Sequence, residues 1–158
     1  MLQEKQVAPD FTLPRFGGGA AAPHQEGKHA IVVFYKYNCP TCQFTLPYVQ
    51  KIYDAYGDAV NFVAVAQDGP EKTAEFRRDF RITMPTLMDE SPYKVSRTYG
   101  IEVVPSIFLV DPDRTIRHAG DGFVKQDLLN LADVLAEKTG RPQIEVFGND
   151  AVPDIKPG

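Results

Sequence analysis

The chain has 158 residues, of which 43% are hydrophobic and 24% are charged, as expected for a soluble globular protein with room for one hydrophobic core. Its 17 basic and 21 acidic residues give a net charge of −4, which argues against binding to nucleic acid or an anionic membrane surface, since both need a basic face. No apolar run is long enough to span a bilayer, so we expect no membrane insertion.

The N-terminal segment shows no targeting signal and no regular structure. "MLQEKQVAPDFTL" has no basic stretch followed by an apolar one, so we expect a cytoplasmic protein, or an extracytoplasmic one if a signal segment has been removed. Residues 8–16, "APDFTLPRF", are extended and interrupted by proline, and residues 17–23, "GGGAAAP", predict a loop. From His29 to Tyr37 a near-continuous apolar run predicts a strand buried on both faces.

A helix is predicted directly after this strand. Cys39 and Pro40 open it, because proline suits the first helical position, where its missing N–H costs nothing. The helix runs to about Gly57, a favourable residue just beyond a helix end. Pro47 lies inside it and is expected to kink it.

Strands and helices alternate along the rest of the chain. The predicted elements are a buried strand from Val60, a charged surface helix at 71–81, a short strand from Pro85, a short helix at 91–100 with Ser91 as N-cap, two strands around a turn at 111–114, and an amphipathic helix at 124–140. This order predicts an α/β fold with a central mixed β-sheet flanked by helices. We expect a single domain over residues 1–158, with a core at about 29–139 and a C-terminal tail at 140–158.

The only two cysteines, Cys39 and Cys42, lie three positions apart at the junction of strand and helix. A structural zinc site needs four ligands, and the histidines at positions 24, 29 and 118 lack the spacing to supply the others, so we expect no metal ligands. A disulfide that closes so short a loop would be a weak structural staple, because it removes little entropy from the unfolded chain.

Redox chemistry explains the position of the pair best. A helix N-terminus carries partial positive charge and unpaired N–H groups, which stabilise a thiolate. We therefore expect Cys39, at the cap, to be the attacking nucleophile, and Cys42, one turn inside on the same face, to resolve the mixed disulfide. Two inert cysteines are the alternative, but they leave the shared junction unexplained.

Three segments of the chain resemble the thioredoxin superfamily. "NCPTC" after "IVVFYKY" resembles its active site, and Pro47 matches the kinking proline of its active-site helix. "EVVPSIFLVDPDRTIRHAG" resembles its cis-proline segment and strand hairpin, with Pro105 as the cis-proline. "APDFTLP" and the extra helix and strand at 70–90 resemble the redoxin branch, which includes TlpA- and ResA-like thiol-disulfide oxidoreductases and alkyl hydroperoxide reductases. The resemblance covers roughly residues 7–139.

The resemblance implies a thioredoxin-like fold with a redoxin-type N-terminal extension and a helix–strand insertion. It implies a monomeric thiol-disulfide oxidoreductase whose partners are protein disulfides or dithiols and an electron donor or acceptor protein. The redox-active disulfide Cys39–Cys42 would serve in place of any cofactor. Pro105 and the backbone of Val104 would bind an extended substrate segment. Five residues are expected to shape the site: Lys36, Tyr37, Asn38, Pro40 and Thr41.

Four positions depart from the family pattern. Asn38 replaces a frequent tryptophan, and Val104 replaces the threonine common before the cis-proline. Val33 and Thr45 stand where relatives have a buried aspartate or a glutamate, so the sequence does not identify the general base of the reaction. Glu102 is a weak substitute, because a solvated loop charge is the simpler interpretation.

Two other functions remain open on the same fold. "CPT" at residues 39–41 resembles the peroxidatic site of a peroxiredoxin-like thiol peroxidase, but the threonine which that chemistry uses three residues before the cysteine is Lys36 here. A copper-binding assembly factor would space its cysteines one residue further apart and add a histidine near the cis-proline. Here serine and isoleucine follow Pro105, and His118 is the only candidate third ligand. We rank both functions behind disulfide exchange.

Overall fold

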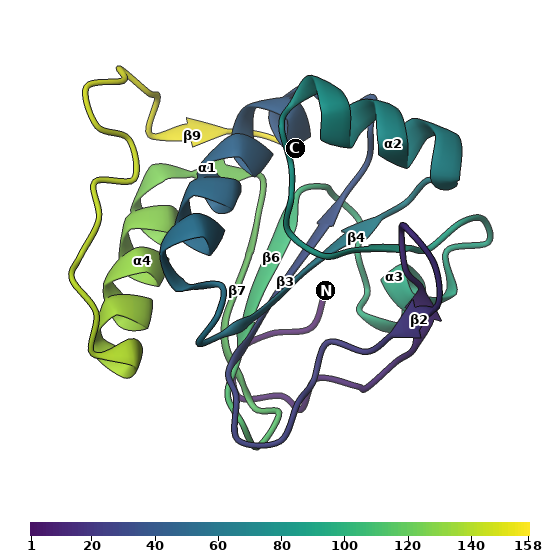
Figure 1. The fold of residues 1–158 in the computed structure, drawn as a ribbon, viewed down its shortest axis with the longest axis horizontal. Coiled ribbons are helices and arrows are strands. Elements are labelled where there is room, and N and C mark those ends of the chain that lie inside the picture. The colour runs from purple at the N-terminus through teal and green to yellow at the C-terminus, as the bar shows by residue number, and fades with distance from the viewer.

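A five-stranded sheet forms the centre of the computed structural model, which describes residues 1–158 (Figure 1). Its strands are β3 (Ala30–Tyr35), β4 (Asn61–Ala66), β5 (Thr86–Met88), β6 (Ser106–Val110) and β7 (Ile116–Asp121). They lie in the order β5-β4-β3-β6-β7. β3 and β5 run parallel to β4, whereas β6 runs antiparallel to both β3 and β7, so the predicted mixed sheet is confirmed.

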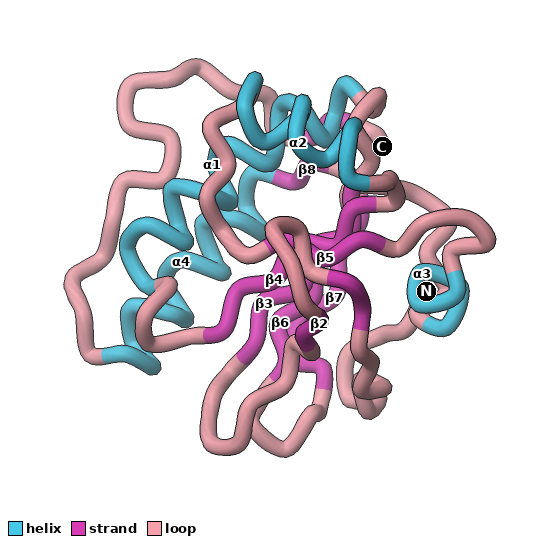
Figure 2. Tube along the Cα trace, turned by 45° about the vertical axis from the view of Figure 1, so that its right-hand side comes forward, coloured by secondary structure: helices cyan, strands magenta, loops and turns pink.

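Helices cover both faces of the sheet. They are α1 (Pro40–Tyr56), α2 (Pro70–Asp79), α3 (Lys94–Thr98) and α4 (Lys125–Thr139). Odd-numbered side chains of β3 enter a core shared with α1, α2 and α4, and even-numbered ones enter a second core with α3 and the N-terminal segment. Figure 2 shows α3 on the opposite side of the sheet from α4. None of these helices is long and apolar enough to cross a membrane.

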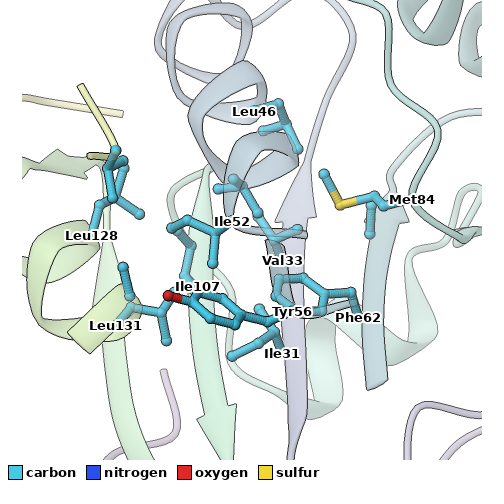
Figure 3. Close-up of a cluster of buried hydrophobic side chains, with 14 of the residues drawn as sticks. Ile31, Val33, Leu46, Ile52, Tyr56, Phe62, Met84, Ile107, Leu128 and Leu131 are labelled. Carbon is cyan, nitrogen blue, oxygen red and sulfur yellow. The ribbon is translucent and has the colours of Figure 1, made fainter. Parts of the chain in front are cut away.

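The larger core fixes α1 on the middle of the sheet. Figure 3 shows buried side chains from three elements packed together: Leu46, Ile52 and Tyr56 from α1, Ile31 and Val33 from β3, and Leu128 and Leu131 from α4. All are at most 3% exposed. Burial of so many apolar side chains gives most of the free energy that holds α1 in place. The N-terminus of α1 is thereby held at the carboxyl end of β3.

Several predicted boundaries shift by one or two residues. β3 ends at Tyr35 rather than Tyr37, because the backbone N–H of Tyr37 donates to the Asp68 carboxylate instead of to a neighbouring strand. The surface helix α2 begins at Pro70 and ends at Asp79, where residues 71–81 were expected. Pro47 lies inside α1, as predicted.

Two small antiparallel sheets lie in segments where the sequence predicts no strand. β1 (Leu13–Pro14) pairs with β2 (Ala20–Ala21), because three glycines with positive φ, at positions 17–19, turn the chain back on itself. β8 (Phe123–Val124) pairs with β9 (Ile155–Lys156), so the end of the C-terminal tail joins the body of the protein.

The start of α3 differs from the expectation. Ser91 is not its N-cap: the helix begins at Lys94, after Tyr93 in a left-handed conformation, and the Ser91–Pro92 peptide bond is cis. The Asp89 carboxylate caps the helix instead. It accepts hydrogen bonds from the backbone N–H groups of Val95 and Ser96, at 3.3 and 2.7 Å, and from the Ser96 hydroxyl at 2.7 Å.

Asp89→Ala should therefore destabilise the protein by about 1–3 kcal/mol, because it leaves buried N–H groups without an acceptor. Urea unfolding followed by circular dichroism measures this loss. Glu145→Ala removes an exposed carboxylate and should change the free energy of unfolding by less than about 0.5 kcal/mol. Equal stability of the two variants would show that Asp89 does not cap α3.

Candidate active site

The two cysteines lie where β3 gives way to α1. Cys39 is the N-cap residue of α1, with extended backbone angles (φ −96°, ψ 113°), and Pro40 takes the first helical position, as predicted. The Cys42 backbone N–H donates a hydrogen bond to the Cys39 sulfur at 3.2 Å. A sulfur atom thus takes the place of the oxygen that commonly caps a helix. The N–H groups and positive end of the helix dipole favour negative charge on this sulfur.

The loop before β6 closes over the Cys39 sulfur from the other side. The Cys39 thiol donates to the Val104 carbonyl oxygen at 3.4 Å. The Val104–Pro105 peptide bond is cis, as the resemblance implies. Cys39 is only partly exposed, so a substrate must approach it between the helix start and the Val104 backbone.

Cys42 lies in a different environment, although its position on the helix is only one turn away. Its side chain is fully buried in the larger core. Burial, and after it the hydrogen bond with Cys39, raise the pKa of the Cys42 thiol. Both thiols are free in this structure. The inner cysteine therefore holds its proton until a reaction step removes it.

Asp68 is a site carboxylate that sequence reasoning missed. It follows β4, is 8% exposed, and its carboxylate accepts the Tyr37 N–H at 2.9 Å. Burial raises the pKa of Asp68, an effect that the Tyr37 N–H and the charges of Lys36 and Lys72 partly oppose. The negative charge of Asp68 contributes to the raised pKa of Cys42. A signal did exist in the sequence, since an aspartate two residues after a buried parallel strand lies at the carboxyl edge of the sheet.

Tyr35 adds a buried polar group to the same region. Its hydroxyl has no hydrogen-bond partner, and the side chain lies fully buried in the core that contains Cys42. Burial, and after it the charge of Asp68, raise the pKa of Tyr35. At the end of β3 a hydroxyl (Tyr35), a thiol (Cys42) and a carboxylate (Asp68) thus lie within range of one another's charge.

The residues expected to shape the site surround the start of α1. The Lys36 ammonium donates to the Tyr93 hydroxyl at 3.3 Å. The Tyr37 carbonyl accepts from the Gln43 side chain at 3.0 Å, which ties the loop to the helix. The remaining three are placed as follows: Asn38 and Pro40 are exposed, and Thr41 is buried.

Other residues weighed from the sequence lie outside the sulfur environment. Glu102 is exposed and lines a small surface pocket together with Val104. His118 pairs with Asp127 of α4, with 3.6 Å between ring nitrogen and carboxylate oxygen. No three His, Cys, Asp or Glu side chains gather where they would hold a metal ion.

The sequence matches one family model and several known proteins. The model of the AhpC/TSA family matches residues 5–119, which include both cysteines and Pro105. The thioredoxin-like protein YneN of Bacillus subtilis (strain 168) is 27% identical over 126 residues, covering 75% of this chain and 73% of the relative. The thiol-disulfide oxidoreductase ResA of Geobacillus thermodenitrificans (strain NG80-2) is 28% identical over 126 residues, covering 77% and 72%.

Solved structures give the same fold. The thioredoxin domain of a thiol-disulfide oxidoreductase from Bacteroides vulgatus superposes with a TM-score of 0.75 at 24% identity. The match covers 85% of this chain and 98% of that domain. The thioredoxin-like fold expected from the sequence is confirmed.

The unequal surroundings of the two sulfurs predict the order of their alkylation. Iodoacetamide at mildly acidic pH should modify Cys39 well before Cys42, because Cys39 is partly exposed whereas Cys42 is buried and has a raised pKa. Peptide mass spectrometry of timed samples measures the order. In the urea-unfolded chain both cysteines should react at similar rates. Faster alkylation of Cys42 in the folded protein would overturn this account of the site.

Asp68→Asn should change how stability depends on pH. The amide oxygen can still accept the Tyr37 N–H, but the buried charge is gone. Because the pKa of Asp68 is raised, the folded wild type binds this proton more tightly than the unfolded chain, and its stability falls as pH rises through the unfolded and then the folded pKa. The variant should lack this fall.

The measurement is urea unfolding of both proteins at several pH values. The stability of Asp68→Asn relative to wild type should increase between about pH 3 and pH 7. A relative stability that stays constant or decreases over this range would show that burial does not dominate the titration of Asp68.

Proposed function

Since the chain belongs to the AhpC/TSA family, we propose that it is a thiol-disulfide oxidoreductase that exchanges its Cys39–Cys42 pair with protein disulfides or dithiols. The observation that carries this proposal is the Cys39 sulfur capping α1, with the Cys42 N–H donating to it at 3.2 Å. Relatives named as thiol-disulfide oxidoreductases support it, and so does the close spacing of the two thiols.

The first step is attack by Cys39. Its thiolate, stabilised by the N-terminus of α1, attacks one sulfur of a substrate disulfide. The substrate S–S bond breaks, the other substrate sulfur leaves as a thiolate and takes up a proton, and a mixed disulfide joins Cys39 to the substrate. The Val104 carbonyl, which accepts from the Cys39 thiol in the resting state, lies beside the attacking atom.

The second step is resolution by Cys42. This thiol loses its proton and attacks the Cys39 sulfur, which releases the second substrate thiol and leaves a Cys39–Cys42 disulfide. Two electrons have then passed from the dithiol to the substrate, and the reverse sequence oxidises a substrate dithiol. Asp68 is the carboxylate whose charge reaches the Cys42 thiol, and its raised pKa suits it to accept a proton from that thiol, directly or through water.

The two alternative functions have less support. The family also contains peroxidases, but the position of the peroxide-binding threonine is Lys36, whose ammonium is engaged by Tyr93. A copper-binding factor would need His118 as its third ligand, but the His118 ring already pairs with the Asp127 carboxylate. We further propose a monomer that exchanges electrons with a separate donor or acceptor protein.

Two assays test the proposed function. The protein should catalyse the reduction of insulin disulfides in the presence of a small thiol, and it should consume hydrogen peroxide slowly by comparison. The doubly substituted Cys39→Ser, Cys42→Ser protein is the control for both reactions. Fast, saturable peroxide turnover without insulin reduction would replace this proposal with the peroxidase function.

Substitution of each cysteine should give unequal results. Cys42→Ser keeps the attacking thiol but removes the resolving one, so covalent complexes with a substrate protein should accumulate and disappear on addition of reductant. Cys39→Ser should abolish activity and trap little, because Cys42 is buried and its pKa is raised. Non-reducing gel electrophoresis with mass spectrometry measures the complexes. Equal trapping by both variants would reverse or remove the assigned roles.

A further inference from the structure

The C-terminal tail is anchored to the body well before it reaches the active site. Val146 and Phe147 are buried in the larger core, at 1% and 6% exposure. The Phe147 ring lies 4.8 Å from that of Tyr48 on α1, measured between centroids, and the Tyr48 hydroxyl donates to Asp150 at 2.9 Å. These contacts hold the middle of the tail, so the residues after Asp150 start from a fixed point.

From this anchor the tail runs to the start of α1 and forms the short strand β9 on the way. β9 pairs antiparallel with β8, and the Lys125 N–H donates to the Asp154 carbonyl at 2.9 Å. Figure 1 shows β9 leading to a chain end that lies beside the first turn of α1. There the Thr41 hydroxyl donates to the Pro157 carbonyl at 2.6 Å, so a residue between the two cysteines binds the tail.

Gly158 then lies against the loop that carries Pro105. A Cβ atom on Gly158 would overlap both the Val104 carbonyl oxygen and the Val103 side chain, so this approach requires glycine. The same Val104 oxygen accepts the hydrogen bond of the Cys39 thiol. The tail therefore lies next to the backbone atoms beside the reactive sulfur.

We propose that residues 153–158 occupy the surface along which an extended substrate segment reaches Cys39, so that the tail and a protein substrate exclude each other. This inference rests on the proposed function. The tail makes the kind of contact expected of a peptide substrate: strand pairing through its backbone, a carbonyl bound by Thr41, and a small residue opposite Val104.

The contacts of the tail suit an occupant that a substrate can displace. β9 contributes only two residues of strand pairing, and the Ile155 side chain is 65% exposed. Asp154, Pro157 and Gly158 are exposed as well, and Lys156 places its ammonium 5.1 Å from the centre of the Phe44 ring. With so few contacts, the closed state, in which the tail covers the site, and the open state, in which it does not, are similar in free energy. The apparent affinity for substrate is then reduced in proportion to the fraction of protein that is open.

Gly158→Val tests the proposal, because the added side chain cannot fit against Val104 and should push the tail away. Ala151→Val is the control, since it also introduces a valine, at an exposed position of the tail outside the site. For Gly158→Val we expect an increase of about three- to tenfold in kcat/KM for insulin and in the rate of Cys39 alkylation by iodoacetamide. The control should match wild type in both measurements.

A synthetic peptide of residues 150–158 provides a second, independent test. It should inhibit insulin reduction by Gly158→Val, whereas a peptide of the same composition in scrambled order should not. Equal alkylation rates of Cys39 in Gly158→Val and Ala151→Val, or equal effects of the two peptides, would overturn the proposal. Absence of insulin reduction by wild type would count against the proposed function alone, because the alkylation rates report on the tail without any substrate.

Discussion

The hydrogen bond from the Cys42 N–H to the Cys39 sulfur is the interaction on which the rest of the site depends. It exists because a buried strand delivers Cys39 to the start of a helix whose first N–H groups have no partner of their own. Proline at the next position has no backbone N–H that would need a partner, and its fixed φ angle suits a helix. The sulfur is thereby held, partly exposed, at the positive end of α1, where a thiolate is favoured.

The large core turns this local arrangement into an asymmetric pair. Because α1 is packed against β3 and α4, Cys42 must point into the interior while Cys39 stays at the edge. The inner thiol keeps its proton and the outer one reacts, so the two steps of disulfide exchange follow in order. Asp68 is held at the same edge by the Tyr37 N–H and supplies a carboxylate to the buried side of the pair.

Local patterns in the sequence were sufficient to predict the sheet, α1 and the placement of Cys39, because a buried apolar run and a Cys-Pro helix start carry their own signals. Features without a distinctive local pattern were not predicted. The Ser91 cap was wrong because Asp89, two residues earlier, reaches over to the helix start. Asp68 was missed because only the folded sheet brings it to Cys42, and the tail at 153–158 has no periodicity that would reveal its pairing with β8.

The most direct test of the central claim is the intact mass of the protein equilibrated in glutathione buffers of increasing oxidised fraction. We predict a reversible loss of two hydrogen atoms, with peptide mapping that shows a Cys39–Cys42 bridge and a single transition between the dithiol and the disulfide. Stable glutathione adducts on both cysteines without a bridge, or a dithiol unchanged across all buffers, would contradict the assignment of this pair as the redox centre.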